Sequence, residues 1–322
     1  MGRLSVPQNN NNNKQLCIGV VGLGPVGSTL AVHLINAGAH VIGCDIDSKK
    51  VDEIKKSGIQ LKHAMHKNAK MPDVCYSVQE LAMYDLDLVI ISTKTPSLKK
   101  ITNLLKEIAT EKMFIMCAQN GIDNELTPSR EFGEERVLRM VINYAGNMAT
   151  KNTVHVSFFN PPNYIAALTP KGEKLAKQIC DLLNSAGLNS EIPDNIQDYV
   201  WEKAILNAAL SAICAITRRT MKDVMDFPQT LDLVETIIDE SVTVAEREGI
   251  DLGKKFRRFC ISYLKNAGHH RPSMLTDLEE GRHTEIDWLN GKIVDYGKKH
   301  YLPTPLNKSV TALVHMLELS QE

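Results

Sequence analysis

A glycine-rich turn between an apolar run and a helical stretch is the feature that most constrains the fold of this chain. Residues 16–21 are apolar and β-branched, the six residues 22–27 read G-L-G-P-V-G, and a helical pattern covers residues 26–37. In such a G-x-G-x-x-G turn the first glycine permits a tight bend, the second lets a pyrophosphate approach the backbone, and the third lets the helix pack closely on the strand. Free N–H groups at the helix N-terminus attract phosphate. The motif therefore predicts a dinucleotide-binding turn, with a turn that holds no ligand as the alternative. Its residues are Gly22, Leu23, Gly24, Pro25, Val26 and Gly27.

The pattern of apolar runs predicts two different halves. Strands are expected at 16–21, 40–45, 86–92, 113–117, 137–144 and 154–159, and helices at 26–37, 48–57, 98–110 and 171–186. Strands that alternate with helices favour parallel pairing with right-handed crossovers. From about residue 198 onward the apolar spacing is helical, over 200–216, 231–248, 254–266, 284–298 and 306–319. We expect an α/β fold: an N-terminal Rossmann-type doubly wound parallel sheet followed by an all-helical C-terminal domain.

The length of 322 residues also favours two domains, because single cores rarely exceed about 250–300 residues. Residues 1–15, which include five consecutive asparagines, are expected to form a disordered tail. Residues 16–193 form the expected dinucleotide-binding domain, and residues 194–322 the expected helical substrate and catalytic domain. A cleft between two such domains is a common place for a small-molecule site.

Composition excludes several classes of protein. The chain has 37 Lys+Arg and 38 Asp+Glu, so no basic surface for nucleic acid or anionic lipid is expected. We find no apolar run that approaches the roughly 18–20 residues of a membrane span, and no secretory signal. The seven cysteines are scattered without a C-x-x-C pair, which favours reduced, buried thiols in a cytoplasmic protein. His63 and His66 have no further ligands around them, so no metal site is expected.

An aspartate at the end of the second expected strand bears on the choice of nucleotide. Asp45 follows Gly27 by 18 residues, close to the spacing of a carboxylate that binds the adenine ribose hydroxyls. Such a carboxylate repels a 2′-phosphate, so NAD(H) is favoured as cofactor and NADP(H) is the alternative. Lys49 and Lys50 could reach a phosphate, although solvated charges on the next helix are the plainer interpretation. Asp47 is the better placed helix cap.

Lys203, Asn207 and Ser211 form one polar stripe on an otherwise apolar helix, because they follow one another at intervals of four residues. A lysine tip that reaches water at a domain edge would explain the stripe. The functional interpretation is an ammonium group that stabilises and then protonates the alkoxide formed when a ketone accepts a hydride. Further on, Ser273 is expected to cap a helix and Glu285 to open the next one.

These segments resemble the ketopantoate reductase (2-dehydropantoate 2-reductase) family over about residues 16–318. The resemblance rests on the glycine motif, residues 92–95 (S-T-K-T), 119–121 (Q-N-G), 201–207, 272–291 and 302–307. It implies reduction of a small 2-keto acid, ketopantoate, to (R)-pantoate by hydride transfer, within pantothenate biosynthesis. It also implies a role for each of the following residues: Lys203 as proton donor to the C2 oxygen, Glu285 as the carboxylate that orients this lysine, Asn120 between nicotinamide and substrate, Lys94 on the cofactor side, and Ser273 and Asn207 on the substrate, with Asp277 in support.

Two departures from the family pattern keep an alternative open. Ser211 stands where the family usually has a second asparagine, and Asp45 and Ile46 stand where most relatives carry an arginine for NADP. Relatives with such changes include NAD-dependent D-2-hydroxy acid dehydrogenases of the D-mandelate type, which is the second interpretation. A non-catalytic NAD-sensing module and the β-hydroxyacid dehydrogenases rank below these two. Cys117 is expected to be a buried strand cysteine rather than a redox group. The preferred keto acid and the oligomeric state, monomer or homodimer, stay open.

Overall fold

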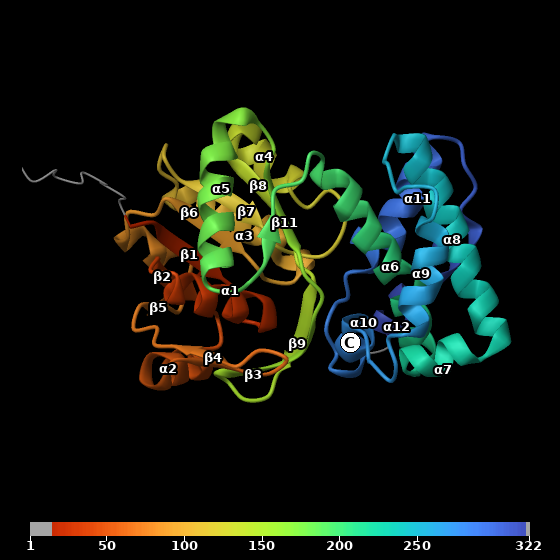
Figure 1. Cartoon of the computed structure of the whole chain (residues 1–322), viewed down its shortest axis with the longest axis horizontal. Helices are drawn as coiled ribbons and strands as arrows, with labels where there is room; N and C mark the ends of the chain where they lie inside the picture. Colours follow the sequence, from red (N-terminus) through yellow and green to blue (C-terminus); the bar gives the residue numbers. More distant parts are fainter. Residues whose placement is uncertain (1–14, 320–322) are drawn as a thin grey trace, which may run out of the picture.

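The computed structural model describes residues 15–319, and it contains a mixed α/β half and a helical half (Figure 1). The expected disordered tail lies outside the described residues, apart from Gln15, whose side-chain amide donates to the Gly38 carbonyl at 2.8 Å. The change from sheet to helices falls between strand β12 (Ser190–Glu191) and helix α6 (Ile196–Thr217).

The main sheet of the α/β half has eight strands in the order β12-β11-β8-β7-β6-β1-β2-β5. The other strands are β1 (Cys17–Val21), β2 (His40–Cys44), β5 (Val74–Cys75), β6 (Leu88–Ile91), β7 (Phe114–Cys117), β8 (Val137–Val141) and β11 (Asn163–Ala167). Pairing is parallel from β5 through to β8, so the expected doubly wound parallel sheet is confirmed. Strand β11 differs from this expectation, because it pairs antiparallel with β8. The strand order reverses at β1, which makes its carboxyl end a topological switch point where such folds bind ligands.

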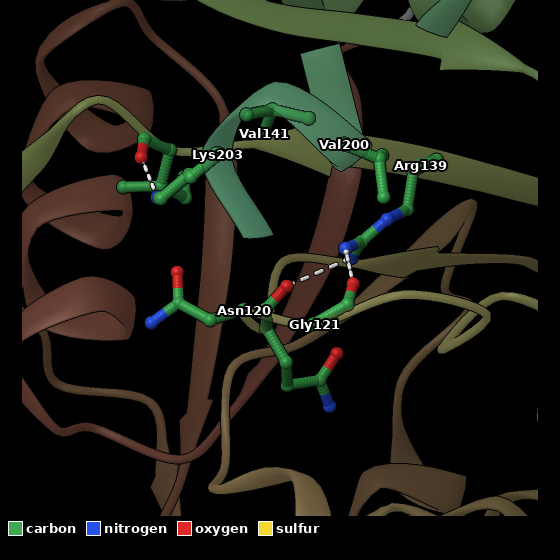
Figure 2. Close-up of a pocket in the computed structure, with 8 residues that line it drawn as sticks. Asn120, Gly121, Arg139, Val141, Val200 and Lys203 are labelled. Atoms are coloured by element: carbon green, nitrogen blue, oxygen red, sulfur yellow. Dashed lines mark hydrogen bonds between the residues drawn. The ribbon is translucent and has the colours of Figure 1, made fainter. Parts of the chain in front are cut away.

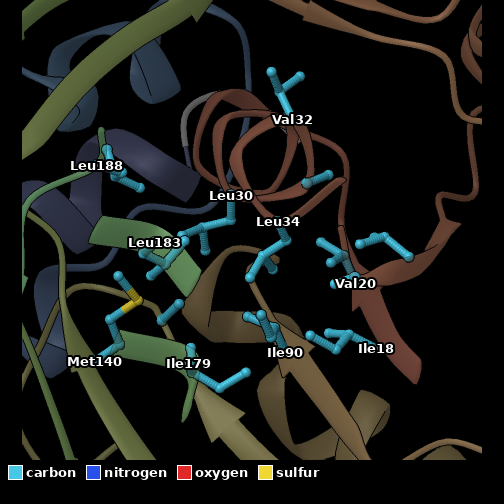
Figure 3. Close-up of a cluster of buried hydrophobic side chains, with 14 of the residues drawn as sticks. Ile18, Val20, Leu30, Val32, Leu34, Ile90, Met140, Ile179, Leu183 and Leu188 are labelled. Carbon is cyan, nitrogen blue, oxygen red and sulfur yellow. The ribbon is translucent and has the colours of Figure 1, made fainter. Parts of the chain in front are cut away.

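Helices cover both faces of this sheet. They are α1 (Pro25–Asn36), α2 (Ser48–Ser57), α3 (Leu98–Ile108), α4 (Leu126–Phe132) and α5 (Pro170–Ser185), with short 3-10 turns η1 (Gln79–Met83), η2 (Thr95–Ser97) and η3 (Glu134–Arg136). In Figure 3, Leu30 and Leu34 of α1 belong to one buried cluster with Ile179 and Leu183 of α5 and with Ile18 and Ile90 of the sheet. All six side chains are fully buried, so this core holds α1 and the glycine turn before it against the sheet.

A second sheet was not expected from the sequence. Its order is β4 (Lys67–Ala69), β3 (Ile59–His63), β10 (Thr153–Phe159) and β9 (Tyr144–Met148). The expected strand at 137–144 is therefore wrong as a single element, since β8 ends at Val141 and β9 of the other sheet begins at Tyr144. The expected strand at 154–159 exists, but it belongs to this second sheet. Two strands of the main sheet, β5 and β12, were also not expected. Each has only two residues, which is too short to show an alternation of apolar and polar side chains.

The helical half is built around α6. The other helices are α7 (Met221–Asp226), α8 (Pro228–Glu248), α9 (Phe256–Lys265), α10 (Ser273–Glu279), α11 (Asn290–Lys299) and α12 (Pro305–Leu319). The expected helix at 284–298 is divided into a 3-10 turn, η4 (Ile286–Trp288), and α11. Contrary to expectation, α6 is long and apolar enough to cross a membrane. However, 67% of its apolar window is buried inside the protein, where α8, α10 and α12 pack against it, as in the core helix of a soluble protein.

Candidate active site

The glycine turn has the backbone geometry that a bound pyrophosphate requires. Gly22 adopts a φ of 95° and donates its N–H to the Cys44 carbonyl at 2.8 Å. A Cβ on Gly27 would lie 2.0 Å from the Gly22 carbonyl oxygen, so only glycine lets α1 approach β1 this closely. A Cβ on Gly24 would meet nothing within 4 Å, which leaves open space at the N-terminus of α1. The turn therefore fits a dinucleotide phosphate.

Asp45 lies at the end of β2, and its carboxylate is already engaged. It accepts the Leu23 N–H at 2.9 Å, the Asp47 N–H at 3.0 Å and the Lys50 ammonium at 3.0 Å. The interpretation of Lys50 as a solvated charge is wrong, because its side chain is only 15% exposed and ion-pairs with Asp45. Asp47 is confirmed as the cap of α2, since it accepts the Lys50 N–H at 3.1 Å.

Lys203 reaches from the helical half to the carboxyl ends of strands β7 and β8. Its ammonium donates to the carbonyl of Ile142, directly after β8 (Figure 2). Together with Asn120, Gly121 and Arg139, it lines a cavity of about 10 Å³, enough for about one water molecule. In Figure 2 the Asn120 side chain extends into the space below Lys203. The structure thus brings these two predicted residues together.

The pKa of Lys203 is lowered to about 7, mainly by burial and next by the positive charge of Arg139, while the negative charge of Glu285 opposes the shift. An amine with this pKa is present in both protonation states at neutral pH. A proton donor works best when its pKa lies near the working pH. Lys203 therefore has the properties of a general acid.

Glu285 lies immediately before η4, and it contacts the α/β half rather than Lys203. Its Oε1 accepts the Thr95 hydroxyl at 2.9 Å and the Thr95 N–H at 3.3 Å. The Thr95 hydroxyl also lies 3.1 Å from the Asn120 carbonyl. Since a hydroxyl has a single proton, it donates to one of these acceptors at a time. Thr95 thus connects Glu285 with the loop that carries Asn120, a role that the sequence did not reveal.

Lys94 and Asp277 form an ion pair between the two halves, 2.6 Å long. Asp277 has a side-chain exposure of 2%, and its other oxygen accepts Arg282 Nη2 at 2.8 Å and Nε at 3.0 Å. Two cations therefore compensate this buried carboxylate. Arg282 is a second residue whose role the sequence did not reveal.

The remaining substrate candidates lie on two helices. Asn207 and Ser211 follow Lys203 by one and two turns on α6, where Asn207 is half-buried and Ser211 is buried. The expected cap at Ser273 is wrong, because Pro272 holds the cap position and the exposed Ser273 is the first residue of α10. Cys117 is confirmed as a buried strand cysteine, and burial raises the pKa of its thiol to about 12.

A buried ion pair between Arg139 on β8 and Glu125 borders the site, because Arg139 lines the same cavity as Lys203. Arg139 Nε lies 3.3 Å from Glu125 Oε2, and the two side chains are 2% and 3% exposed. A single arginine within the apolar strand sequence of residues 137–141, V-L-R-M-V, was the available signal. A charge is rarely buried unless it is paired, so this pattern predicts a partner.

Comparisons with known proteins match this chain to the same family along nearly its whole length. A family model described as "Ketopantoate reductase PanE/ApbA" matches residues 18–169, and its C-terminal counterpart matches residues 195–318. The 2-dehydropantoate 2-reductase of Aquifex aeolicus is 28% identical over 310 residues, which is 93% of this chain and 96% of that protein. The enzyme of Streptococcus pyogenes serotype M1 is 27% identical over 301 residues, 93% and 97% of the two chains.

Among solved structures, a ternary complex of D-mandelate dehydrogenase with NADH and anilino(oxo)acetate has a TM-score of 0.85 at 29% identity and covers 95% of this chain and 99% of that chain. A ketopantoate reductase from Ralstonia eutropha JMP134 has the same TM-score at 24% identity, with the same coverage, and supports the fold. The matches to both halves, together with the glycine turn and the α6 helix, show that this chain belongs to the ketopantoate reductase family.

Proposed function

We propose that this protein reduces ketopantoate to (R)-pantoate with a nicotinamide cofactor, and that Lys203 is the proton donor. The observation that carries the proposal is the Lys203 amine, which lies beside Asn120 with a pKa of about 7. The 2-dehydropantoate 2-reductases at 27–28% identity support this activity. A domain boundary near residue 193 would assign the nucleotide to the α/β half and most substrate contacts to the helical half.

NAD(H) is the proposed cofactor, bound by the glycine turn (Gly22 to Gly27), Asp45, Lys94 and Asn120. The D-mandelate dehydrogenase with a similar fold contains NADH, which supports a nicotinamide nucleotide. Asp45 would accept the ribose hydroxyls, while Lys50 neutralises part of its charge and leaves NADP(H) as the alternative. When bound, the cofactor supplies a hydride to the keto carbon.

Lys203 would protonate the C2 oxygen as negative charge develops on it, and then regain a proton from water. Glu285, which favours the charged form of Lys203, would keep the amine protonated before the reaction. Asn120 would donate its side-chain amide to the keto acid. Ser273, Asn207 and Ser211 would bind the carboxylate and hydroxyl groups, with Asp277 positioned by Lys94 and Arg282.

A D-2-hydroxy acid dehydrogenase of the D-mandelate type is the second candidate. It is favoured by Ser211 in place of an asparagine, because a hydroxyl is shorter and offers fewer donors to a pantoyl hydroxyl. The structural similarity to D-mandelate dehydrogenase points the same way.

Steady-state reduction of ketopantoate and of phenylglyoxylate, each with NADH and with NADPH, tests both candidates. The proposal expects the highest kcat/KM with ketopantoate and NADH. A higher value with phenylglyoxylate would favour the second candidate. Absence of turnover with a panel of 2-keto acids would instead favour a non-catalytic NAD-sensing module.

A further inference from the structure

Arg139 is a buried charge that the proposed reaction does not use directly. It lies in the middle of β8, a strand whose five residues are all buried, and its side chain is 2% exposed. Burying an unpaired charge is costly, so the residues that compensate it indicate what it stabilises. Its neighbours belong to the two segments that carry Asn120 and Lys203.

The guanidinium holds the loop that carries Asn120. It donates to the carbonyls of Gln119 at 2.9 Å and Gly121 at 2.8 Å, on either side of Asn120 (Figure 2). It also donates to the carbonyl of Cys117 at 3.3 Å. The planar fork of arginine reaches several acceptors in a fixed geometry, which an ammonium group does not. Arg139 therefore helps to fix the position of Asn120, together with Thr95 and Asn124, whose side chains lie within hydrogen-bond distance of the Asn120 carbonyl.

The ion-pair partner of Arg139 connects the same cluster to α6. Glu125 approaches Arg139 with Oε2, and its Oε1 accepts the side-chain amide of Gln197 at 2.7 Å. Gln197 lies in the first turn of α6, on the helix that carries Lys203. The buried pair thus fixes the loop of Asn120 and the helix of Lys203 relative to each other.

Arg139 also faces Lys203 across the small cavity that both side chains line. The charged groups that act on Lys203 are Arg139 from β8 and Glu285 from the segment before η4. Arginine stays charged at every pH at which the enzyme folds, so its effect on the lysine is constant. In a buried site, a charge that lines the same cavity as an amine changes the proton affinity of that amine far more than it would in water.

We propose that Arg139 is a positioning residue for the keto acid reduction, because it fixes the loop of Asn120 and places a permanent positive charge beside Lys203. The inference rests on the proposed function for its kinetic consequence, but the charge effect on Lys203 is measurable without turnover. Arg139 itself need not touch the substrate.

The test compares Arg139→Lys, which keeps the charge, with Arg139→Met, which removes it. Both variants are expected to lower kcat by about 10- to 100-fold, since a displaced catalytic group costs that much. Only Arg139→Met should also raise the pH at which kcat/KM falls on the alkaline side, by about one unit. The double variant Arg139→Met/Glu125→Gln leaves no unpaired charge, so it keeps the test valid if the single variant does not fold.

A direct titration avoids any dependence on activity. In protein with ¹³C-labelled lysine ε-carbons, the resonance of Lys203 is expected to titrate near pH 7 and is identified by its loss in Lys203→Met. Its midpoint should rise by about one unit in Arg139→Met and in the double variant, and stay unchanged in Arg139→Lys. Arg136→Met is a matched control, because Arg136 also donates to backbone carbonyls but lies in η3, outside the cavity.

An unchanged midpoint in Arg139→Met and in the double variant would overturn the proposed charge effect. An equal shift in Arg139→Lys would do the same, because it would show that packing rather than charge sets the midpoint. Unchanged kcat in both single variants would overturn the positioning role. If wild-type protein reduces no keto acid but the titration shifts as expected, the proposed function fails while the charge effect stands.

Discussion

Replacing Lys203 by methionine should strongly reduce activity and, at neutral pH or below, stabilise the protein. In the folded protein burial lowers the pKa of Lys203 to about 7, whereas the unfolded chain has the ordinary value of 10.5. Between these values the unfolded state binds more protons, so the stability that Lys203 contributes is complete above pH 10.5 and is lost as the pH falls to about 7. The pKa difference corresponds to at most about 5 kcal/mol of unfolding free energy.

The expected gain in unfolding free energy for Lys203→Met is smaller than this limit, about 2–4 kcal/mol at pH 6, because the variant leaves the Ile142 carbonyl without its hydrogen-bond donor. Urea unfolding from pH 6 to 10 would measure it. The difference in unfolding free energy between Lys203→Met and wild type should shrink as the pH rises. The titration of thiols and tyrosines contributes equally to both proteins and therefore cancels in this difference. A variant no more stable than wild type at pH 6, with a difference that does not change with pH, would refute the reasoning. Its kcat should fall by about 10²-fold or more, the usual effect of losing a positioned acid.

Four further substitutions test the rest of the site. Gly27→Ala should destabilise the protein by about 2 kcal/mol or more in thermal unfolding, since its Cβ would collide with the Gly22 carbonyl. Gly24→Ala should unfold like wild type but bind NADH about 10-fold more weakly by fluorescence titration, because its Cβ enters only open space; unchanged affinity would argue against the phosphate site. Asp45→Ala should raise the KM for NADH and narrow its advantage over NADPH, and an unchanged preference would contradict this assignment. Ser211→Asn should raise kcat/KM for ketopantoate by about 10-fold in steady-state assays, and no increase would mean that this position does not bind the substrate.

Local patterns predicted most of the regular elements because each was encoded within its own segment. The run of β1, the glycine turn and α1 could be assigned from about twenty residues, and the apolar spacing of α6 and α8 was readable in the same way. Errors occurred where neighbours far along the chain decide the structure. The residues 137–148 divide between two sheets because β9 pairs with β10, and nothing in the segment itself indicates that partner.

The sequence by itself determined the nucleotide-type fold, the family, and the residue types that a keto acid reductase needs, because motifs of glycines, a lysine helix and spaced polar residues are local. Only the tertiary structure decided how these groups are charged and held. It placed Lys50 on Asp45, Thr95 against Glu285, and Arg139 against the loop of Asn120 and in the same cavity as Lys203. Proton affinity and position depend on burial and on charges brought together from distant segments, and these exist only once the chain has folded.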